Sequence, residues 1–299
     1  MTTNIQVRLG LMGIGLDSYW PQFEGLKQRL EGYEHLIHNR LAGDKITVVD
    51  AGLVDNLTKA ANAAGLFSRE QVDLIFLYVS TYALSSTVLP VVKAIKAPVV
   101  VLNLQPTAQI DYAYFNSLPS REEMTSEWLA YCQACATPEI ASVFNRAGID
   151  YHLVTGTLDD SPAWAEIGAW VDAAYIAKTL RCSSIGLLGH YYCGMMDVYS
   201  DYTQLAAVFG NHFEIVEMDE LKALRDLVTE AEVEEMVAEF RHTFDVSAEC
   251  SETELRRAAR TSCALQKLSR LVGPCRPCGW HAKSHKGCYG TLFRTDRNT

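Results

Sequence analysis

The sequence predicts an α/β fold of two doubly wound, Rossmann-like parallel-sheet domains, the second incomplete, followed by an irregular C-terminal tail. Short apolar runs rich in β-branched residues alternate with longer amphipathic segments, the pattern of a parallel sheet covered by helices. This pattern restarts near residue 180, and regular periodicity ends near residue 269. The predicted boundaries are therefore 1–178, 179–268 and 269–299.

The first part of the chain carries four strand-like runs and three helical segments. The run from Asp73 to Val79 is almost continuously apolar, as expected for a strand with helices on both faces. In the first helical segment, Leu26, Leu30 and Ile37 repeat at helical spacing. The expected strands are Ile5–Met12, Lys45–Ala51, Val72–Val79 and Pro98–Leu104, and the expected helices are Gln22–Leu41, Val54–Leu66 and Ala83–Lys96.

The rest of the regular chain continues the alternation. Pro162 begins a helix, since its missing N–H costs least in the first turn. Thr229 with Glu232, and Ser251 with Glu254, match the capping box that opens a helix. Further expected elements are a helix over Glu122–Ala147, a strand at Tyr151–Val154, the helix Pro162–Leu180, strands at Ser184–Leu188 and Phe213–Met218, a helix at Tyr199–Phe209, and an N-cap at Asp219.

Composition narrows the partners of this 299-residue chain. A net charge of −10 argues against binding to nucleic acid or an anionic membrane, because phosphate recognition needs clustered Lys and Arg. The start lacks a leader-like apolar run, and the longest apolar stretch is too short to span a bilayer. Nine cysteines are too sparse for a secreted disulfide scaffold. We therefore expect a cytoplasmic protein with reduced core cysteines at Cys182, Cys193, Cys250 and Cys263.

The tail differs from the rest of the chain. Residues 269–299 hold six Lys or Arg and one acidic residue, a net charge of +5, so residues 1–268 carry −15. The tail holds thiols and imidazoles of the kind that bind Zn²⁺. The cysteine pair and the histidine pair are separated by fewer residues than a zinc finger requires. Two interpretations stay open: a zinc-binding appendage, or an out-of-frame or disordered segment. The residues concerned are Cys275, Cys278, His281, His285 and Cys288.

Neutral polar residues follow several predicted strands. In open α/β sheets, ligands bind at the carboxyl ends of strands. Ser18 and Tyr19 follow the first strand, beside Asp17; Ser80 to Tyr82 follow the third, and Asn103 to Thr107 end the fourth. Hydroxyls and amides suit an uncharged, hydroxyl-rich ligand such as a sugar, with Tyr82 and Gln105 the best candidates. The alternative is ordinary turn and cap chemistry.

The second predicted domain offers weaker candidates. His190 and Asp197 follow a strand and could face a cleft. A single histidine after a strand is more often a hydrogen-bonded loop residue, which is the alternative here. The glycines after the first strand do not have the GxGxxG spacing of a dinucleotide site.

Five ordered blocks carry a resemblance to a known family: GIGLDSYWPQFEGLKQRLEGY, LYVSTYALSSTVLP, VVVLNLQPTAQIDY, HLVTGTLDD with AWVDAAYIAKTLR, and IGLLGHYYCGMMDVYSD. Over about residues 5–268 the chain resembles the L-arabinose isomerase and L-fucose isomerase family, and more closely its arabinose-isomerase-like branch. The resemblance implies a homo-oligomer of three-domain subunits that interconverts an aldose and a ketose, usually with Mn²⁺. In that chemistry carboxylates shuttle the proton while the cation stabilises the oxyanion.

The resemblance also indicates which residues would contact the sugar. Leu16, Tyr82 and Gln105 match positions that line the family's sugar pocket, from which they can serve a neighbouring subunit. No catalytic residue and no metal ligand carries over, because the family's glutamates and histidines lie downstream of the matched region. His281 and His285 do not match those histidines.

Two functional hypotheses follow. The first is a sugar ketol-isomerase family member, truncated or frameshifted near residue 268, which lacks the Mn²⁺ ligands and is inactive alone. The second is a non-catalytic, two-lobed sugar-binding module. In the first case we expect an incomplete middle domain to expose the apolar residues Val233, Met236, Val237 and Phe240. The sequence leaves the sugar and the number of subunits open.

Overall fold

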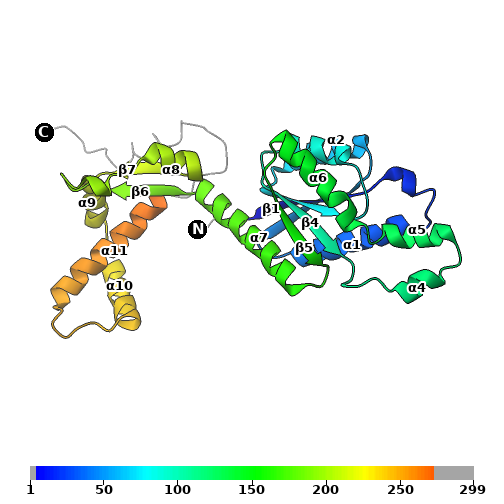
Figure 1. The fold of residues 1–299 in the computed structure, drawn as a ribbon. Coiled ribbons are helices and arrows are strands. Elements are labelled where there is room, and N and C mark those ends of the chain that lie inside the picture. Colours follow the sequence, from blue (N-terminus) through cyan, green and yellow to red (C-terminus); the bar gives the residue numbers. More distant parts are fainter. Residues whose placement is uncertain (1–4, 273–299) are drawn as a thin grey trace. The chain divides into compact units, whose positions relative to one another are not determined.

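A computed structural model describes residues 5–272 of the chain. Contacts between residues divide the chain into two compact units, which we call the first and the second unit. The first unit ends at Lys178 and the second begins at Thr179. Each unit contains parallel strands and helices, so the predicted α/β class is confirmed (Figure 1).

The first unit is built on a five-stranded parallel sheet. Its strand order is β2-β1-β3-β4-β5, so the second strand in sequence lies at one edge and the chain then crosses back over β1. β3 is buried along its whole length, as its continuously apolar sequence predicts. The strands are β1 (Val7–Ile14), β2 (Ile46–Val54), β3 (Leu74–Val79), β4 (Val99–Gln105) and β5 (Tyr151–Thr157).

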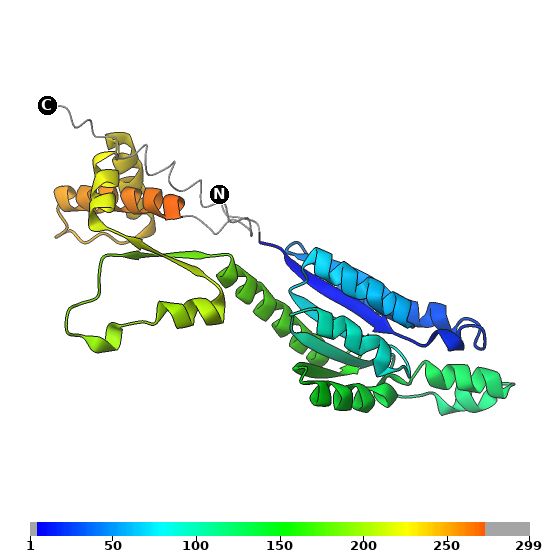
Figure 2. The ribbon, with the colours of Figure 1, turned by 90° about the horizontal axis from the view of Figure 1, so that it is seen from above.

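Helices cover both faces of this sheet (Figures 1 and 2). One face packs against α1 (Leu26–Leu41) and α7 (Ser161–Arg181), through a core that includes Leu9. The other face packs against three helices through a core that includes Phe67. A Cβ on Gly10 would lie 3.2 Å from the Phe67 ring, so the ring packs closely on β1 there. The three helices are α2 (Leu57–Glu70), α3 (Ser85–Ala94) and α6 (Gln133–Ala147).

The single helix expected over 122–147 is wrong, because the structure has two helices there. α5 (Arg121–Leu129) ends before α6 begins, and one distant and one neighbouring side chain bind the carbonyls at the break. Thr81 Oγ1 donates to Leu129 O at 2.7 Å, and Gln133 Nε2 donates to Ala130 O at 2.9 Å. A short helix, α4 (Tyr112–Ser117), was not predicted; its N-cap Asp111 accepts from Tyr114 N–H.

The second unit contains a two-stranded parallel sheet, β6 (Ser184–Leu188) and β7 (His212–Val216). The predicted N-cap at Asp219 is wrong, since this residue lies inside the first turn of α9 (Met218–Asp226) and Glu217 is the N-cap. The predicted capping box of Thr229 and Glu232 is confirmed. The other elements are a 3₁₀ turn at Met196–Val198 and the helices α8 (Tyr202–Phe209), α10 (Glu230–Thr243) and α11 (Glu252–Val272).

The core of the second unit corrects two predictions. Val233, Met236 and Val237 were expected to be exposed but are buried, because α11 covers this face of α10 with residues such as Ala259. Phe240 is partly buried against the same core. Of the four cysteines predicted to lie in a core, only Cys263 is buried; Cys182 is half-buried, and Cys193 and Cys250 are exposed.

Other apolar residues of the second unit are exposed, in its loops and helices, such as Met196 and Val208, and on its sheet. Ile185 and Leu188 of β6 are exposed, and Ile215 of β7 has 63% of its surface exposed. Within residues 5–272, no helix combines the length and the apolar character that crossing a bilayer requires.

Candidate functional site

The strand order marks one place in the first unit as the expected ligand site. The chain leaves β1 toward β2 on one side and later returns to β3 on the other, so the order reverses between β1 and β3. In open α/β sheets, ligands bind beside the carboxyl ends of the strands at such a switch point. The residues that follow β1 and β3 therefore form the candidate site, which we call the switch-point edge.

The loop after β1 is held firmly by backbone and side-chain bonds. Gly15 N–H donates to Val54 O at 3.2 Å, and a Cβ on Gly15 would lie 2.9 Å from the Trp20 side chain. Trp20 Nε1 donates to the buried carboxylate of Asp55 at 2.8 Å, and Lys59 Nζ lies 2.6 Å from the same oxygen. Leu16 stands half-buried in this fixed loop.

Of the hydroxyl groups that follow β3, two form bonds within the protein and one is exposed to solvent. Ser80 and Thr81 are buried, and the Ser80 hydroxyl donates to Ile14 O at 2.5 Å, which ties β3 to β1. Tyr82 is 40% exposed. Burial raises the pKa of Tyr19, and Tyr82 and Cys132 raise it further. The switch-point edge thus has tyrosines in the loops that follow β1 and β3.

Gln105, at the end of β4, is already engaged in bonds within the protein. With its amide turned to match its neighbours, its nitrogen donates to Tyr131 O at 3.2 Å and to Gln133 Oε1 at 2.8 Å. Its oxygen then accepts from Ala134 N–H at 3.2 Å. Gln105 therefore joins β4 to the junction of α5 and α6, and it would have to exchange these bonds to bind a sugar.

A buried carboxyl group beneath this edge was missed by the sequence analysis. Glu34 of α1 is 4% exposed, and its Oε1 accepts from Gly13 N–H at 2.7 Å. Burial, followed by the charge of Asp50, raises its pKa to about 8 against the opposing effect of the Gly13 N–H. Glu34 therefore stays largely protonated near neutral pH. The signal was present, because Glu34 falls between Leu30 and Ile37 on the apolar stripe of its helix.

A phenol lies close to this carboxyl group. The Tyr78 hydroxyl is buried near Gln133, Tyr33 and Glu34, and its burial raises the pKa of Tyr78 well above the usual range. The Glu34 carboxyl group and the Tyr78 phenol therefore both favour their neutral forms.

The candidates of the second unit stand on the surface. His190 is exposed, and its Nε2 lies 3.6 Å from Glu217 Oε2. Asp197 is exposed in the 3₁₀ turn. Neither belongs to a metal cluster: among residues 5–272, no three His, Cys, Asp or Glu side chains are grouped so that they could hold an ion. The Cys and His residues of the tail, Cys275 to Cys288, lie outside the described residues.

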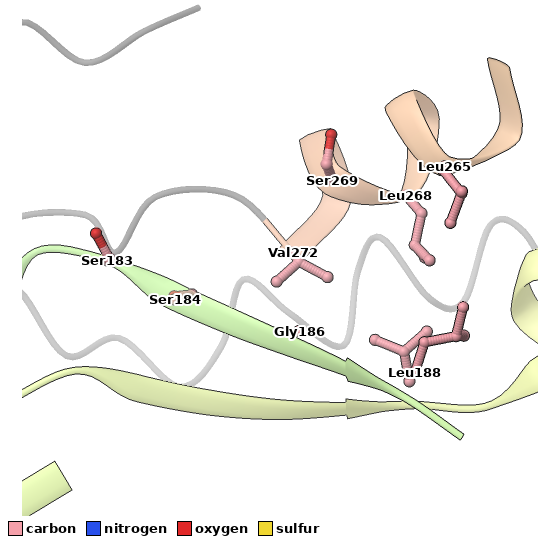
Figure 3. Close-up of a pocket in the computed structure, with 9 residues that line it drawn as sticks. Ser183, Ser184, Gly186, Leu188, Leu265, Leu268, Ser269 and Val272 are labelled. Atoms are coloured by element: carbon pink, nitrogen blue, oxygen red, sulfur yellow. The ribbon is translucent and has the colours of Figure 1, made fainter. Parts of the chain in front are cut away.

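Two cavities are lined by residues other than those of the switch-point edge. One, of about 550 Å³, lies in the second unit between β6 and α11, where Leu188, Leu268 and Val272 line it (Figure 3). The other, of about 630 Å³, lies in the first unit at the amino ends of β4 and β5, beside Pro98 and Trp170. Neither is lined by Leu16, Tyr82 or Gln105.

The fold and its edge define a doubly wound α/β protein with neutral hydroxyl groups at the switch point. No family model matches the chain. It is 22% identical over 185 residues to an L-arabinose isomerase of Bifidobacterium animalis subsp. lactis, which covers 60% of this chain and 35% of that protein. It is 28% identical over 111 residues to an L-arabinose isomerase of Nocardioides sp., with 37% and 22% coverage.

The chain thus spans about a third, or less, of the length of the curated relatives it matches. The resemblance to L-arabinose isomerases is supported by these two similarities, whereas the resemblance to L-fucose isomerases stays a prediction. The assignment of Leu16, Tyr82 and Gln105 to sugar contacts also stays a prediction.

Proposed function

We propose that this chain is a sugar ketol-isomerase family member of the L-arabinose isomerase type whose first unit supplies sugar contacts but which does not catalyse isomerisation alone. The observation that carries the proposal is the exposed Tyr82 at the switch-point edge of a chain similar to two L-arabinose isomerases. Leu16 adds an apolar contact from the neighbouring loop. Neutral hydroxyl donors beside an apolar side chain suit a sugar.

Manganese does not fit the residues that the structure describes. Isomerisation by proton transfer needs a cation to polarise oxygen and carboxylates to move the proton. Residues 5–272 offer no group of three potential ligands, and Glu34 is engaged by Gly13. We therefore assign no catalytic step to these residues and propose that sugar binding is the contribution of the first unit.

A second candidate is the non-catalytic sugar-binding module. The exposed hydroxyl group of Tyr82 at the switch-point edge suits such a module as well as a subunit of an isomerase. The two candidates differ in affinity. A sugar-binding module forms its whole pocket and binds its sugar by itself. Part of an isomerase subunit supplies only one side of a pocket that other residues complete, so on its own it binds the sugar weakly.

The test uses the purified 299-residue chain with L-arabinose and L-fucose, with and without Mn²⁺. The proposal predicts no ketose above the protein-free control. It also predicts no heat in calorimetry, but weak saturation transfer to the sugar in ligand-observed NMR. Strong calorimetric binding without metal would favour the module, ketose formation would overturn the claim of inactivity, and a blank NMR spectrum would overturn the sugar contacts.

The matched variants are Tyr82→Phe and Tyr112→Phe. Tyr112 is an exposed tyrosine on α4 and keeps its hydroxyl away from β3. Each change removes one phenolic oxygen without altering charge or bulk. Tyr82→Phe should lower saturation transfer roughly threefold, as expected for the loss of one hydrogen bond, while Tyr112→Phe should leave it unchanged.

A further inference from the structure

Two cysteines meet at the start of α6. Cys132 is the N-cap residue and Cys135 lies in the first turn, in the sequence Cys-Gln-Ala-Cys. The Cys135 thiol donates to the Cys132 sulfur, with 3.2 Å between the two Sγ atoms. Cys132 is 1% exposed, whereas Cys135 is exposed. The pair therefore offers one sulfur to solvent and keeps the other directly behind it.

The backbone around the pair is braced. Cys135 N–H donates to Cys132 O at 3.1 Å, which fixes the turn between them. Gln133, between the cysteines, donates through Nε2 to Ser80 O at 2.9 Å and anchors the turn to β3. An S–S bond measures about 2.0 Å, so a movement of about 1 Å by the sulfur atoms closes it. Side-chain rotation can supply that movement while the backbone stays in place.

The two thiols differ in chemical environment. Burial raises the pKa of the Cys132 thiol, and its contact with Cys135 raises it further. A thiol in this environment stays protonated and reacts slowly with reagents in solution, because the thiolate is the nucleophile. The exposed Cys135 is therefore the sulfur that meets an external reagent first.

We propose that Cys132 and Cys135 form a redox-active dithiol that closes to an intramolecular disulfide by exchange with a small disulfide such as oxidised glutathione. The Cys135 thiolate attacks one sulfur of that disulfide and forms a mixed disulfide, releasing one small thiol. Cys132 then loses its proton and attacks Cys135 Sγ, which releases the second small thiol. Two protein thiols are oxidised and one small disulfide is reduced to two thiols, so atoms and electrons balance.

The site adjoins the switch-point edge, since Gln133, between the two cysteines, donates to the carbonyl of Ser80, which directly follows β3. Its assignment does not depend on the proposed sugar function, because it concerns only the chemistry of the two thiols. The sequence signal is a Cys-x-x-Cys spacing, which near a βαβ pattern is typical of redox pairs.

The test equilibrates the full chain in mixtures of oxidised and reduced glutathione, traps free thiols with N-ethylmaleimide and maps the peptides by mass spectrometry. The expected product is one peptide that contains both cysteines, has lost two hydrogen atoms and takes up no label. Cys250→Ser, which removes an exposed cysteine of the second unit, should leave this product unchanged.

Two single variants separate the roles of the sulfurs. Cys132→Ser should accumulate glutathione on Cys135, since no second thiol resolves the mixed disulfide. Cys135→Ser should leave Cys132 largely unlabelled in the native chain, with circular dichroism and label uptake in urea showing that the chain is folded and the thiol free. Full labelling of both cysteines after treatment of the parent chain with oxidised glutathione, or disulfides from either one to other cysteines, would overturn the proposal.

Discussion

Both units contain strands with apolar segments, but the burial of these segments differs greatly between the units. β3 in the first unit is buried at every residue, because β1 and β4 flank it and helices cover both its faces. β6 in the second unit is also apolar over Ile185–Leu188, yet Ile185 and Leu188 are exposed, and Ile215 of β7 is 63% exposed. An apolar run therefore predicts a strand, but its burial depends on how many strands and helices surround it. Parallel sheets normally require cover on both faces.

The second unit is instead stabilised by its helices. α9, α10 and α11 share one core in which Val233 and Ala259 are fully buried. Surface ion pairs accompany this core, including Arg256 with Glu230 and Glu234, each at 2.6 Å. Exposed pairs of this kind contribute little to stability. The first unit should therefore respond to core truncation far more strongly than the sheet of the second.

The largest expected effect comes from emptying the core of the first unit. Phe67→Ala should lower the free energy of unfolding by about 3–5 kcal/mol, since it leaves a cavity against Gly10. The matched change Ile215→Ala in the second unit should cost less than about 1 kcal/mol, because little buried surface is lost. Urea unfolding followed by hydrogen exchange in β1 and β7 separates the two. Similar losses in both units would remove the difference we infer.

The next effect concerns pH and Glu34. The folded chain holds the Glu34 proton up to about pH 8, whereas the unfolded chain releases it near its ordinary pKa of 4.5. Between these values the unfolded state binds fewer protons, so stability should fall as pH rises from 4.5 to 8. One pKa unit corresponds to about 1.4 kcal/mol, which makes the whole change on the order of a few kcal/mol.

Glu34→Gln tests this pH dependence without removing the acceptor for Gly13 N–H. In urea unfolding, the stability of the variant should not decline between pH 5 and 8, and at pH 8 the variant should be more stable than the parent chain. The control Glu24→Gln removes a charge from an exposed residue just before α1 and should keep the decline. An unchanged slope in Glu34→Gln would show that the carboxyl group is not held neutral.

A smaller difference in the free energy of unfolding is expected between loss of a partly buried ion pair and loss of an exposed one. Arg29 of α1 forms two bonds to Glu127 of α5, at 2.5 and 3.2 Å, and the Glu127 side chain is mostly buried. Glu127→Gln should cost about 1–2 kcal/mol, because it leaves a partly buried guanidinium without its charge partner. Glu234→Gln in the second unit should cost less than about 0.5 kcal/mol. Chemical denaturation of both variants measures the difference, and equal costs would contradict it.

The smallest change in stability is expected for Ile215→Thr. The substitution removes exposed apolar surface from β7 and should alter the free energy of unfolding by less than about 0.5 kcal/mol. It should still reduce self-association, since open apolar strands template pairing with other chains. Light scattering at increasing concentration provides the measurement. Unchanged scattering would show that this face does not drive association.

Local patterns predicted much of the fold, and distant contacts explain the errors. The strand at 184–188 and the Thr229 capping box follow from nearby residues alone, and both were predicted. The break between α5 and α6 depends on Thr81, which lies 48 residues away from Leu129. The cover on Val233 likewise comes from α11. Neither could be predicted from the periodicity of a single segment.

The candidate site shows the same division. Placing Leu16 and Tyr82 at one sheet edge needed only the positions of strand ends, whereas the engagement of Gln105 with Tyr131 and Gln133 depends on the packing of α6. Glu34 and the Cys132–Cys135 spacing were visible in the sequence. Their significance came from burial and from the distance between sulfur atoms, which the sequence does not contain.

The most direct measurement is a titration of the isotope-labelled full chain with L-arabinose, followed by amide NMR. Our account predicts that shifts concentrate at Leu16 and at Ser80 to Tyr82, where the strand order reverses, and that the amides of β6 and β7 do not move. Shifts confined to the second unit, or none at sugar concentrations that saturate weak sites, would contradict a sugar-binding edge in the first.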